Sequence, residues 1–82
     1  MPAVTMLYFA GVRERIGRAQ EVLELPERTS DADLLRHLST LHPDAAGLLA
    51  CSRVAVDQDF VRGVISLRAG VEVAVIPPVS GG

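Results

Sequence analysis

The stretch "RTSDADLLRHLSTLHP", residues 28–43, is the one segment of this chain with a clear helical pattern. Leu34, Leu35, Leu38 and Leu41 follow one another at i, i+1, i+4 and i+7, which places them on one face of a helix. The sequence therefore predicts a single main helix whose leucine face packs against another element.

Both ends of this helix carry the expected signals. Thr29 or Ser30 can cap the first turn, where Asp31 and Asp33 also suit the positive end of the helix dipole. Pro43 prevents the helix from continuing. The Ser-Asp pair is interpreted as a cap, and not as part of a nucleophilic set with a nearby histidine.

Short apolar runs rich in valine, leucine and aromatic residues lie on both sides of the helix. Such runs, ended by glycine or proline, predict strands. In the second run Leu23 and Leu25 are expected to point inward and Glu24 outward. The predicted strands are residues 3–11, 21–27, 53–61 (a strand, a tight turn at Asp57-Gln58 and a short return) and 71–76, with connections at 12–20 and 62–70 and a helical turn at 44–52.

The first and last runs are the most apolar, so they are expected side by side at the centre of a mixed sheet. They would run parallel, with the helix packed across one face. One helix over a mixed sheet is a two-layer α+β domain. The pattern therefore predicts a β-grasp domain over residues 1–76, followed by a tail over residues 77–82.

Composition excludes several classes of function. The 82 residues make one small domain with a net charge of −2 and no basic stripe, so nucleic-acid binding is not expected. The N-terminal apolar run is too short to span a membrane and lacks a basic region before it, so no membrane association and a cytoplasmic location are expected. All eight basic residues are arginine, so no side-chain amine is available for Schiff-base chemistry.

Candidate catalytic side chains are few. His37 and His42 are the two histidines, and without further ligands at metal-binding spacing they are predicted to be surface or helix-end residues. Cys51 is the single cysteine, which rules out an internal disulfide. It is predicted to be a small, partly buried apolar residue, because it lies at the wrong end of a helical turn for an activated thiolate.

The composition of the tail "PPVSGG" suits a chain terminus that takes part in chemistry. Pro77 and Pro78 cannot pair in a sheet and favour an extended path. The six residues can reach about 20 Å. Gly81 and Gly82 have no side chains, so this end can enter a narrow channel and present a terminal carboxylate there.

Three stretches together resemble the MoaD-type sulfur carriers, the small subunits of molybdopterin synthase. They are "LYFAGVRERIG" (7–17), "VAVDQDFV" (54–61) and "GVEVAVIPPVSGG" (70–82), and the last is the most specific. The resemblance covers the whole chain and implies a ubiquitin-like β-grasp fold. The chain departs from the family where Val75-Ile76 replaces a frequent aromatic pair and Val71 a frequent acidic residue.

The resemblance implies a chemistry centred on the terminal carboxylate. An ATP-dependent activating enzyme would adenylate it, and sulfur would then replace one oxygen to give a thiocarboxylate. The large subunit of a heterotetrameric synthase would supply the catalytic residues and pass the sulfur to cyclic pyranopterin monophosphate, which forms the molybdopterin dithiolene. The chain itself would be a non-catalytic sulfur donor that binds no cofactor or metal.

The resemblance also assigns roles to individual positions. Gly82 carries the working carboxylate. Arg13 matches a common arginine of the first motif, where partner recognition and a surface ion pair with Glu14 are both open. The other matched positions are Gly81 with Pro77, Pro78, Val79 and Ser80 in the inserted tail, and Phe9, Phe60 and Ile76 as apolar residues that face the partner.

Three other functions remain open from the sequence. A carrier for thiamine synthesis or another sulfur relay would also end in Gly-Gly, although the thiamine carrier usually lacks the Pro-Pro pair. A ubiquitin-like modifier would use the same activated carboxylate to acylate lysines of target proteins. A plain interaction domain would tolerate deletion of Gly82.

Overall fold

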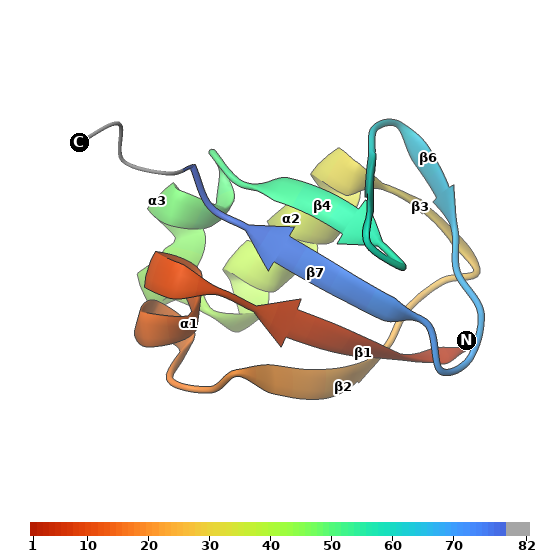
Figure 1. Cartoon of the computed structure of the whole chain (residues 1–82), viewed down its shortest axis with the longest axis horizontal. Coiled ribbons are helices and arrows are strands. Elements are labelled where there is room, and N and C mark those ends of the chain that lie inside the picture. Colours follow the sequence, from red (N-terminus) through yellow and green to blue (C-terminus); the bar gives the residue numbers. More distant parts are fainter. Residues whose placement is uncertain (79–82) are drawn as a thin grey trace.

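The computed structural model describes residues 1–78, and the remaining four residues lie outside the described part. Helices pack against one face of a mixed sheet in a small two-layer domain (Figure 1). In chain order the elements are β1 (Ala3–Tyr8), α1 (Ala10–Ile16), β2 (Gln20–Glu24), β3 (Arg28–Ser30), α2 (Asp31–Leu41), the 3-10 helix η1 (Pro43–Ala45), α3 (Ala46–Leu49), β4 (Arg53–Val56), β5 (Asp59–Val61), β6 (Val64–Ser66) and β7 (Glu72–Ile76).

The predicted pairing of the first and last strands is confirmed. The main sheet has the order β2-β1-β7-β4-β5, and β1 and β7 run parallel at its centre. Met6 lies opposite Val73 and Tyr8 lies opposite Val75, and all four side chains are buried beneath α2. The α2 and α3 helices lie behind the sheet in the view of Figure 1. The domain is therefore α+β, as the sequence predicts.

Helix α2 begins as expected and ends with a difference. The hydroxyl of Ser30 accepts a hydrogen bond from the backbone N–H of Asp33 at 3.0 Å, which confirms the cap. Leu34 and Leu38 are buried in the core. Leu41 is 45% exposed, so its predicted place on the buried face is wrong. The helix ends at this residue, and within its last turn Leu38 takes the buried position while Leu41 does not.

Residues 12–20 were expected to be a connection, and that expectation is wrong for most of them. Helix α1 covers Ala10–Ile16 and ends at Gly17, whose φ of 87° closes the helix in the left-handed conformation. The helix buries Val12, and Ile16 packs against the same core. Two apolar residues four positions apart, between charged residues and glycines, give too weak a periodicity to predict a helix.

A second, two-stranded sheet joins β3 to β6. Thr29 lies opposite Ile65 in this antiparallel pair, and the sequence predicted neither strand. Three-residue strands carry almost no periodic signal. Asp31 reinforces the junction, because its carboxylate accepts a hydrogen bond from the Gly63 N–H while its own N–H donates to the Gly63 carbonyl, both at 3.0 Å.

The remaining predicted turns are confirmed. The β4–β5 hairpin turns at Asp57 and Gln58, both with positive φ, and the chain before β7 turns at Gly70 with a φ of 83°. The helical turn expected after Pro43 is present as η1 and α3. Leu23 in β2 and Leu25, the residue after the strand, both pack into the core as expected.

Candidate functional site

The face of the main sheet opposite α2 is partly apolar and bears no helix. Ala74, at its centre, lies opposite Leu7 on one side and Ala55 on the other, and Ala55 lies opposite Phe60. Because the two alanine side chains are small, the middle of this face is recessed and forms a shallow groove of about 330 Å³. Its lining consists of Leu7, Phe9, Ala55, Gln58, Phe60, Glu72, Ala74 and Ile76.

Three of the sequence-predicted partner residues meet at this groove. Phe9 and Phe60 are 45% and 51% exposed, which is unusual for phenylalanine, and Ile76 is part of the same lining. The guanidinium carbon of Arg53 lies 3.9 Å from the centroid of the Phe60 ring, a cation–π contact that supports the ring from one side. We call the groove and its lining residues the outer groove.

Strand β7 carries the chain from the outer groove to the tail. Ile76 is its last residue, as the prediction of a strand ending at Pro77 requires. Pro77 is buried and Pro78 is exposed, so the chain leaves the surface of the domain at Pro78. Of the predicted tail residues, Val79, Ser80, Gly81 and Gly82 lie outside the described residues.

Arg13 does not reach the outer groove. It lies exposed on α1, and within residues 1–78 its side chain forms no ion pair with Glu14 or any other carboxylate. The surface ion pair considered from the sequence is therefore not formed in this structure.

The other candidate side chains lie apart from the groove. His37 is exposed on α2, as expected. Cys51 is exposed, so its predicted partial burial is wrong, and its thiol donates to the Gly47 carbonyl at 3.6 Å. No cluster of three or more His, Cys, Asp or Glu side chains able to hold a metal occurs in the described part of the chain. Within the same residues, no helix is long and apolar enough to cross a membrane.

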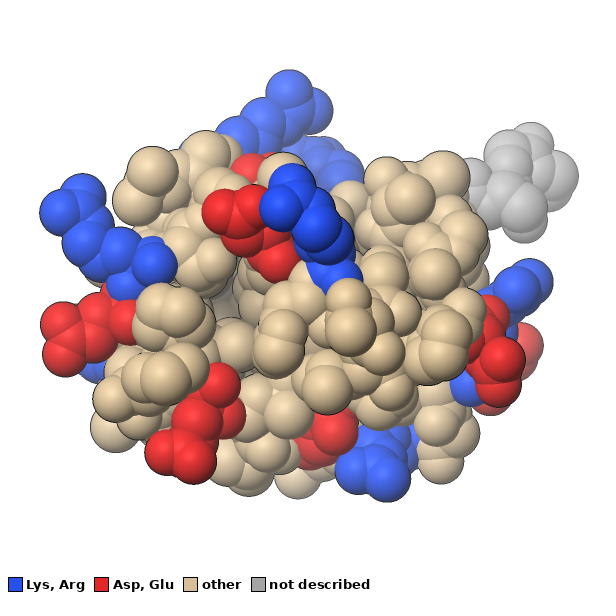
Figure 2. Space-filling model, turned by 180° about the vertical axis from the view of Figure 1, so that it is seen from behind, with Lys and Arg blue, Asp and Glu red and all other residues tan. Residues whose placement is uncertain are grey.

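Charges on the helix side of the molecule are mixed. Figure 2 shows acidic and basic side chains interspersed over this face, without a continuous basic patch. This distribution agrees with the small net charge of −2. A surface of this kind does not provide the row of cations that phosphate backbones require.

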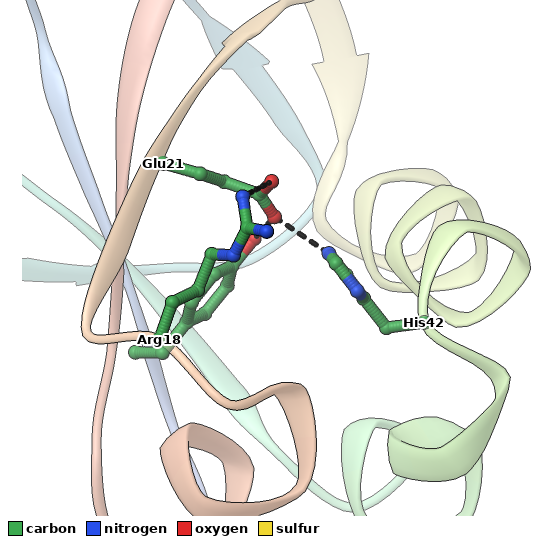
Figure 3. Close-up of polar contacts among 4 residues, drawn as sticks. Arg18, Glu21 and His42 are labelled. Carbon is green, nitrogen blue, oxygen red and sulfur yellow. Dashed lines mark hydrogen bonds and ion pairs between the residues drawn. The ribbon is translucent and has the colours of Figure 1, made fainter.

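A partly buried polar cluster, which the sequence did not reveal, lies between the sheet and the end of α2 (Figure 3). The Tyr8 hydroxyl donates a short hydrogen bond to the Glu21 carboxylate, and Nε2 of His42 lies 2.6 Å from Oε2 of Glu21. Arg18 reaches the other carboxylate oxygen at 3.3 Å. His42 is a helix-end residue, as expected, but it is only 19% exposed and also contacts the Tyr8 ring edge-on.

The cluster perturbs two ionisable groups. Burial first, and then the hydrogen bond and charge of Glu21, raise the pKa of Tyr8 far above its ordinary value. Burial acts to raise the pKa of Glu21, but hydrogen bonds from Tyr8 and His42 and the charges of His42 and Arg18 outweigh it, so the net shift is downward. The cluster ties β1, β2 and α2 together on the face opposite the outer groove, and its role is therefore structural.

This cluster predicts an acid-sensitive stability. Because the pKa of Glu21 is lower in the folded chain, its ionised form stabilises the fold above the ordinary value of 4.5, and that contribution is lost as pH falls through the folded pKa. We expect Glu21→Gln to lower the free energy of unfolding at pH 7 by about 1–3 kcal/mol and to flatten its fall between pH 5 and pH 2. Urea titrations at several pH values measure both effects.

Glu24→Gln is the matched control, since Glu24 is an exposed carboxylate on the same strand. It should change neither quantity appreciably. If the free energy of unfolding of Glu21→Gln falls between pH 5 and pH 2 as steeply as that of the unmodified chain, the cluster does not cause the pH dependence.

Comparison with known proteins shows which family this chain resembles in sequence. The model of the ThiS family matches residues 6–82. A protein of Chlamydomonas reinhardtii named molybdopterin synthase sulfur carrier subunit is 36% identical over 81 residues, which cover 96% of this chain and 98% of the relative.

Two solved structures show the same fold. A putative molybdopterin converting factor, subunit 1, from Pyrococcus furiosus has a TM-score of 0.80 at 29% identity and covers 96% of this chain and 100% of its own. SAMP1 from Haloferax volcanii has a TM-score of 0.78 at 23% identity and covers 98% of this chain and 99% of its own. Proteins of different names thus share the fold, and the fold alone does not decide between them.

Proposed function

Because this chain belongs to the ThiS family, and its relatives of similar length carry sulfur for molybdopterin synthase, we propose that it is a sulfur-carrier subunit of that enzyme. Its working group is the terminal carboxylate of Gly82. The observation that carries the proposal is the match to molybdopterin synthase carriers along nearly the whole chain, including the Gly-Gly end.

The chemistry requires activation of that carboxylate. A carboxylate oxygen attacks the α-phosphate of ATP on an activating enzyme, which releases pyrophosphate and leaves an acyl-adenylate. Hydrosulfide, delivered by a sulfur donor, then attacks the acyl carbon and displaces AMP, and loss of its proton to solvent leaves a thiocarboxylate at the terminus. The chain supplies no acid, base or cofactor to these steps, and the activating enzyme and the large subunit supply them.

The structure supports a chain that provides the terminal carboxylate while its partners provide the catalytic groups. The partly buried cluster of titratable side chains, Tyr8–Glu21–His42, lies on the face of the sheet opposite the outer groove, and none of the three side chains lines that groove. The tail departs from the central strand at Pro78, and four further residues separate Pro78 from the terminus. These residues can span about 13–14 Å when extended, which is enough to reach into a partner's active site.

The outer groove is the surface proposed for the large subunit. Two half-exposed phenylalanines and an adjacent isoleucine form the kind of aromatic, apolar patch that carries binding energy in protein interfaces. Because β7 lies under the groove and leads directly into the tail, a partner docked there receives the terminus at a fixed position. The activating enzyme needs the same terminus, so we expect the two partners to bind in turn.

Two alternatives use the same end group. A carrier for thiamine synthesis would also form a thiocarboxylate, but the relatives named for molybdopterin synthase, at 35–36% identity over more than nine-tenths of the chain, favour the molybdopterin route. A protein modifier would form amide bonds with lysines of target proteins. SAMP1 shares the fold, but at 23% identity that likeness reaches no further than the fold.

Reconstitution tests the proposal. The purified chain is combined with its activating enzyme, ATP, a sulfur donor and the large subunit, and cyclic pyranopterin monophosphate is added. Formation of one molybdopterin for every two thiocarboxylates consumed is the expected result, because a dithiolene contains two sulfur atoms and each chain delivers one. Turnover with thiazole precursors and not with the pyranopterin, or covalent adducts on other proteins as the main product, would favour the alternatives.

A further inference from the structure

Ala10 has a backbone conformation that L-residues rarely adopt. Its φ is 49°, in the left-handed region, where the Cβ atom crowds the backbone. Within residues 1–78 the other non-glycine residues with positive φ are Asp57 and Gln58. Strain of this kind persists only where the surrounding structure enforces it, and it is often found at functional sites.

The conformations of Asp57 and Gln58 have an ordinary cause. They are the two central residues of the β4–β5 hairpin, and two-residue hairpins favour positive φ at both positions because the turn then matches the twist of the strands. Ala10 belongs to no hairpin. It is the first residue of α1, two positions after the end of β1, so the strain at this position needs another explanation.

The chain is anchored on both sides of Ala10. Before it, Tyr8 is buried and its hydroxyl donates to Glu21. After it, Val12 is fully buried. An added Cβ at Gly11 would lie 2.8 Å from Cδ2 of Leu48, so α1 approaches α3 closely at that point. Phe9 and Ala10, the two residues between Tyr8 and Gly11, must therefore turn the chain from the sheet into the helix.

Phe9 is the residue whose position depends on this turn. Its backbone is extended, with φ −130° and ψ 154°, and its carbonyl accepts hydrogen bonds from the N–H groups of Val12 at 3.1 Å and Arg13 at 3.3 Å. Its ring is 45% exposed and lines the outer groove. The left-handed residue Ala10 follows Phe9 directly and turns the chain so that the Phe9 carbonyl can accept these two hydrogen bonds from α1.

We propose that Ala10 is a positioning residue, whose left-handed conformation holds Phe9 in the orientation needed for docking before any partner arrives. This inference rests on the proposed function, because it takes the large subunit as the partner that docks on the outer groove. A ring that is already in place loses little conformational freedom on binding, and ordering a flexible side chain weakens association.

The substitution Ala10→Gly separates positioning from folding. Glycine adopts the left-handed conformation without strain but also permits many others. We expect the thermal midpoint to stay the same or to rise by a few degrees, while the Kd for the large subunit of the same organism increases about two- to tenfold. In ¹⁵N relaxation measurements on the free chain, we expect the order parameter of the Phe9 amide to fall.

Asp57→Gly is the matched control, because it relieves a positive φ of nearly the same size, 48° against 49°, at a residue outside the groove lining. It should leave both the Kd and the order of Phe9 unchanged. Equal effects of the two variants, or an Ala10→Gly chain with unchanged order at Phe9 and unchanged Kd, would overturn the role of Ala10.

The experiment also separates this inference from the proposed function. If the unmodified chain does not bind the large subunit at all, the proposed function fails. The relaxation measurement on the free chain still decides whether Ala10 holds Phe9, since it involves no partner.

Discussion

Deletion of Gly82 is expected to abolish sulfur transfer while leaving the fold intact. The deletion shortens the tail by about 3.3–3.6 Å. Displacement of a reacting group by about 1 Å can already cost about 100-fold in rate, so we expect a loss of at least that size in molybdopterin formed by the reconstituted synthase. The free energy of unfolding should change by less than about 0.5 kcal/mol, because the residue follows the last strand by six positions.

Val79→Ala provides a control that alters the tail without changing its length. It should retain most of the activity, because the terminal carboxylate still reaches the same distance. Activity of the Gly82 deletion within a few-fold of the unmodified chain would remove the terminal carboxylate from the mechanism and would favour a plain interaction domain.

Phe60→Asp is expected to weaken binding of the large subunit by about 100-fold or more. Truncation of an aromatic anchor in an interface typically costs 2 kcal/mol or more, and the new carboxylate would also have to be desolvated in an apolar patch. The side chain is half exposed in the free chain, so folding should lose little beyond the contact with Arg53, worth about 0.5–1 kcal/mol. Titration calorimetry gives the Kd and urea unfolding gives the stability.

The matched control is Val64→Asp, which places the same charge on another exposed apolar residue. Val64 is 67% exposed and lies on β6, in the two-stranded sheet and outside the groove lining. It should leave the Kd nearly unchanged. A similar loss for both variants would indicate a general effect of charge, and no loss for Phe60→Asp would move the docking surface away from the outer groove.

Long-range strand pairing could be predicted here because hydrophobicity varies strongly along the chain. The runs at 3–8 and 72–76 are mostly apolar, with one face buried and the other partly so, and a strand at the centre of a sheet has a neighbour on each side that covers it best. Helix α1 could not be predicted in this way. Its stability depends on packing of Val12 against the core and of Gly11 against Leu48, and neither contact is visible as a local pattern.

The outer groove was only partly predictable. Phe9, Phe60 and Ile76 were assigned through the family resemblance, and the structure brings them together, whereas Ala55 and Ala74 drew no attention because small residues carry no distinctive signal. Residues 3–8 carry apolar side chains at odd as well as even positions. This was the one local indication that the outer face is also apolar. Pairing of Ala74 with both neighbours becomes apparent only from the register.

No local sequence pattern could have predicted the polar cluster. Tyr8, Glu21 and His42 are separated by 13 and 21 residues, and their contact depends on the antiparallel pairing of β1 with β2 and on where α2 ends. For Cys51 the sequence predicted partial burial, but the structure shows the side chain exposed. A cysteine is usually buried, but here it follows a one-turn helix whose buried side is already filled by Leu49.

The mass of the intact chain, purified from cells that contain its activating enzyme and sufficient sulfur, tests the central claim most directly. The account predicts a fraction in which one oxygen has been replaced by one sulfur, located by fragmentation at Gly82 and missing from the Gly82 deletion. An unmodified mass throughout, with the activating enzyme shown to form the acyl-adenylate, would contradict the proposal that this chain carries sulfur.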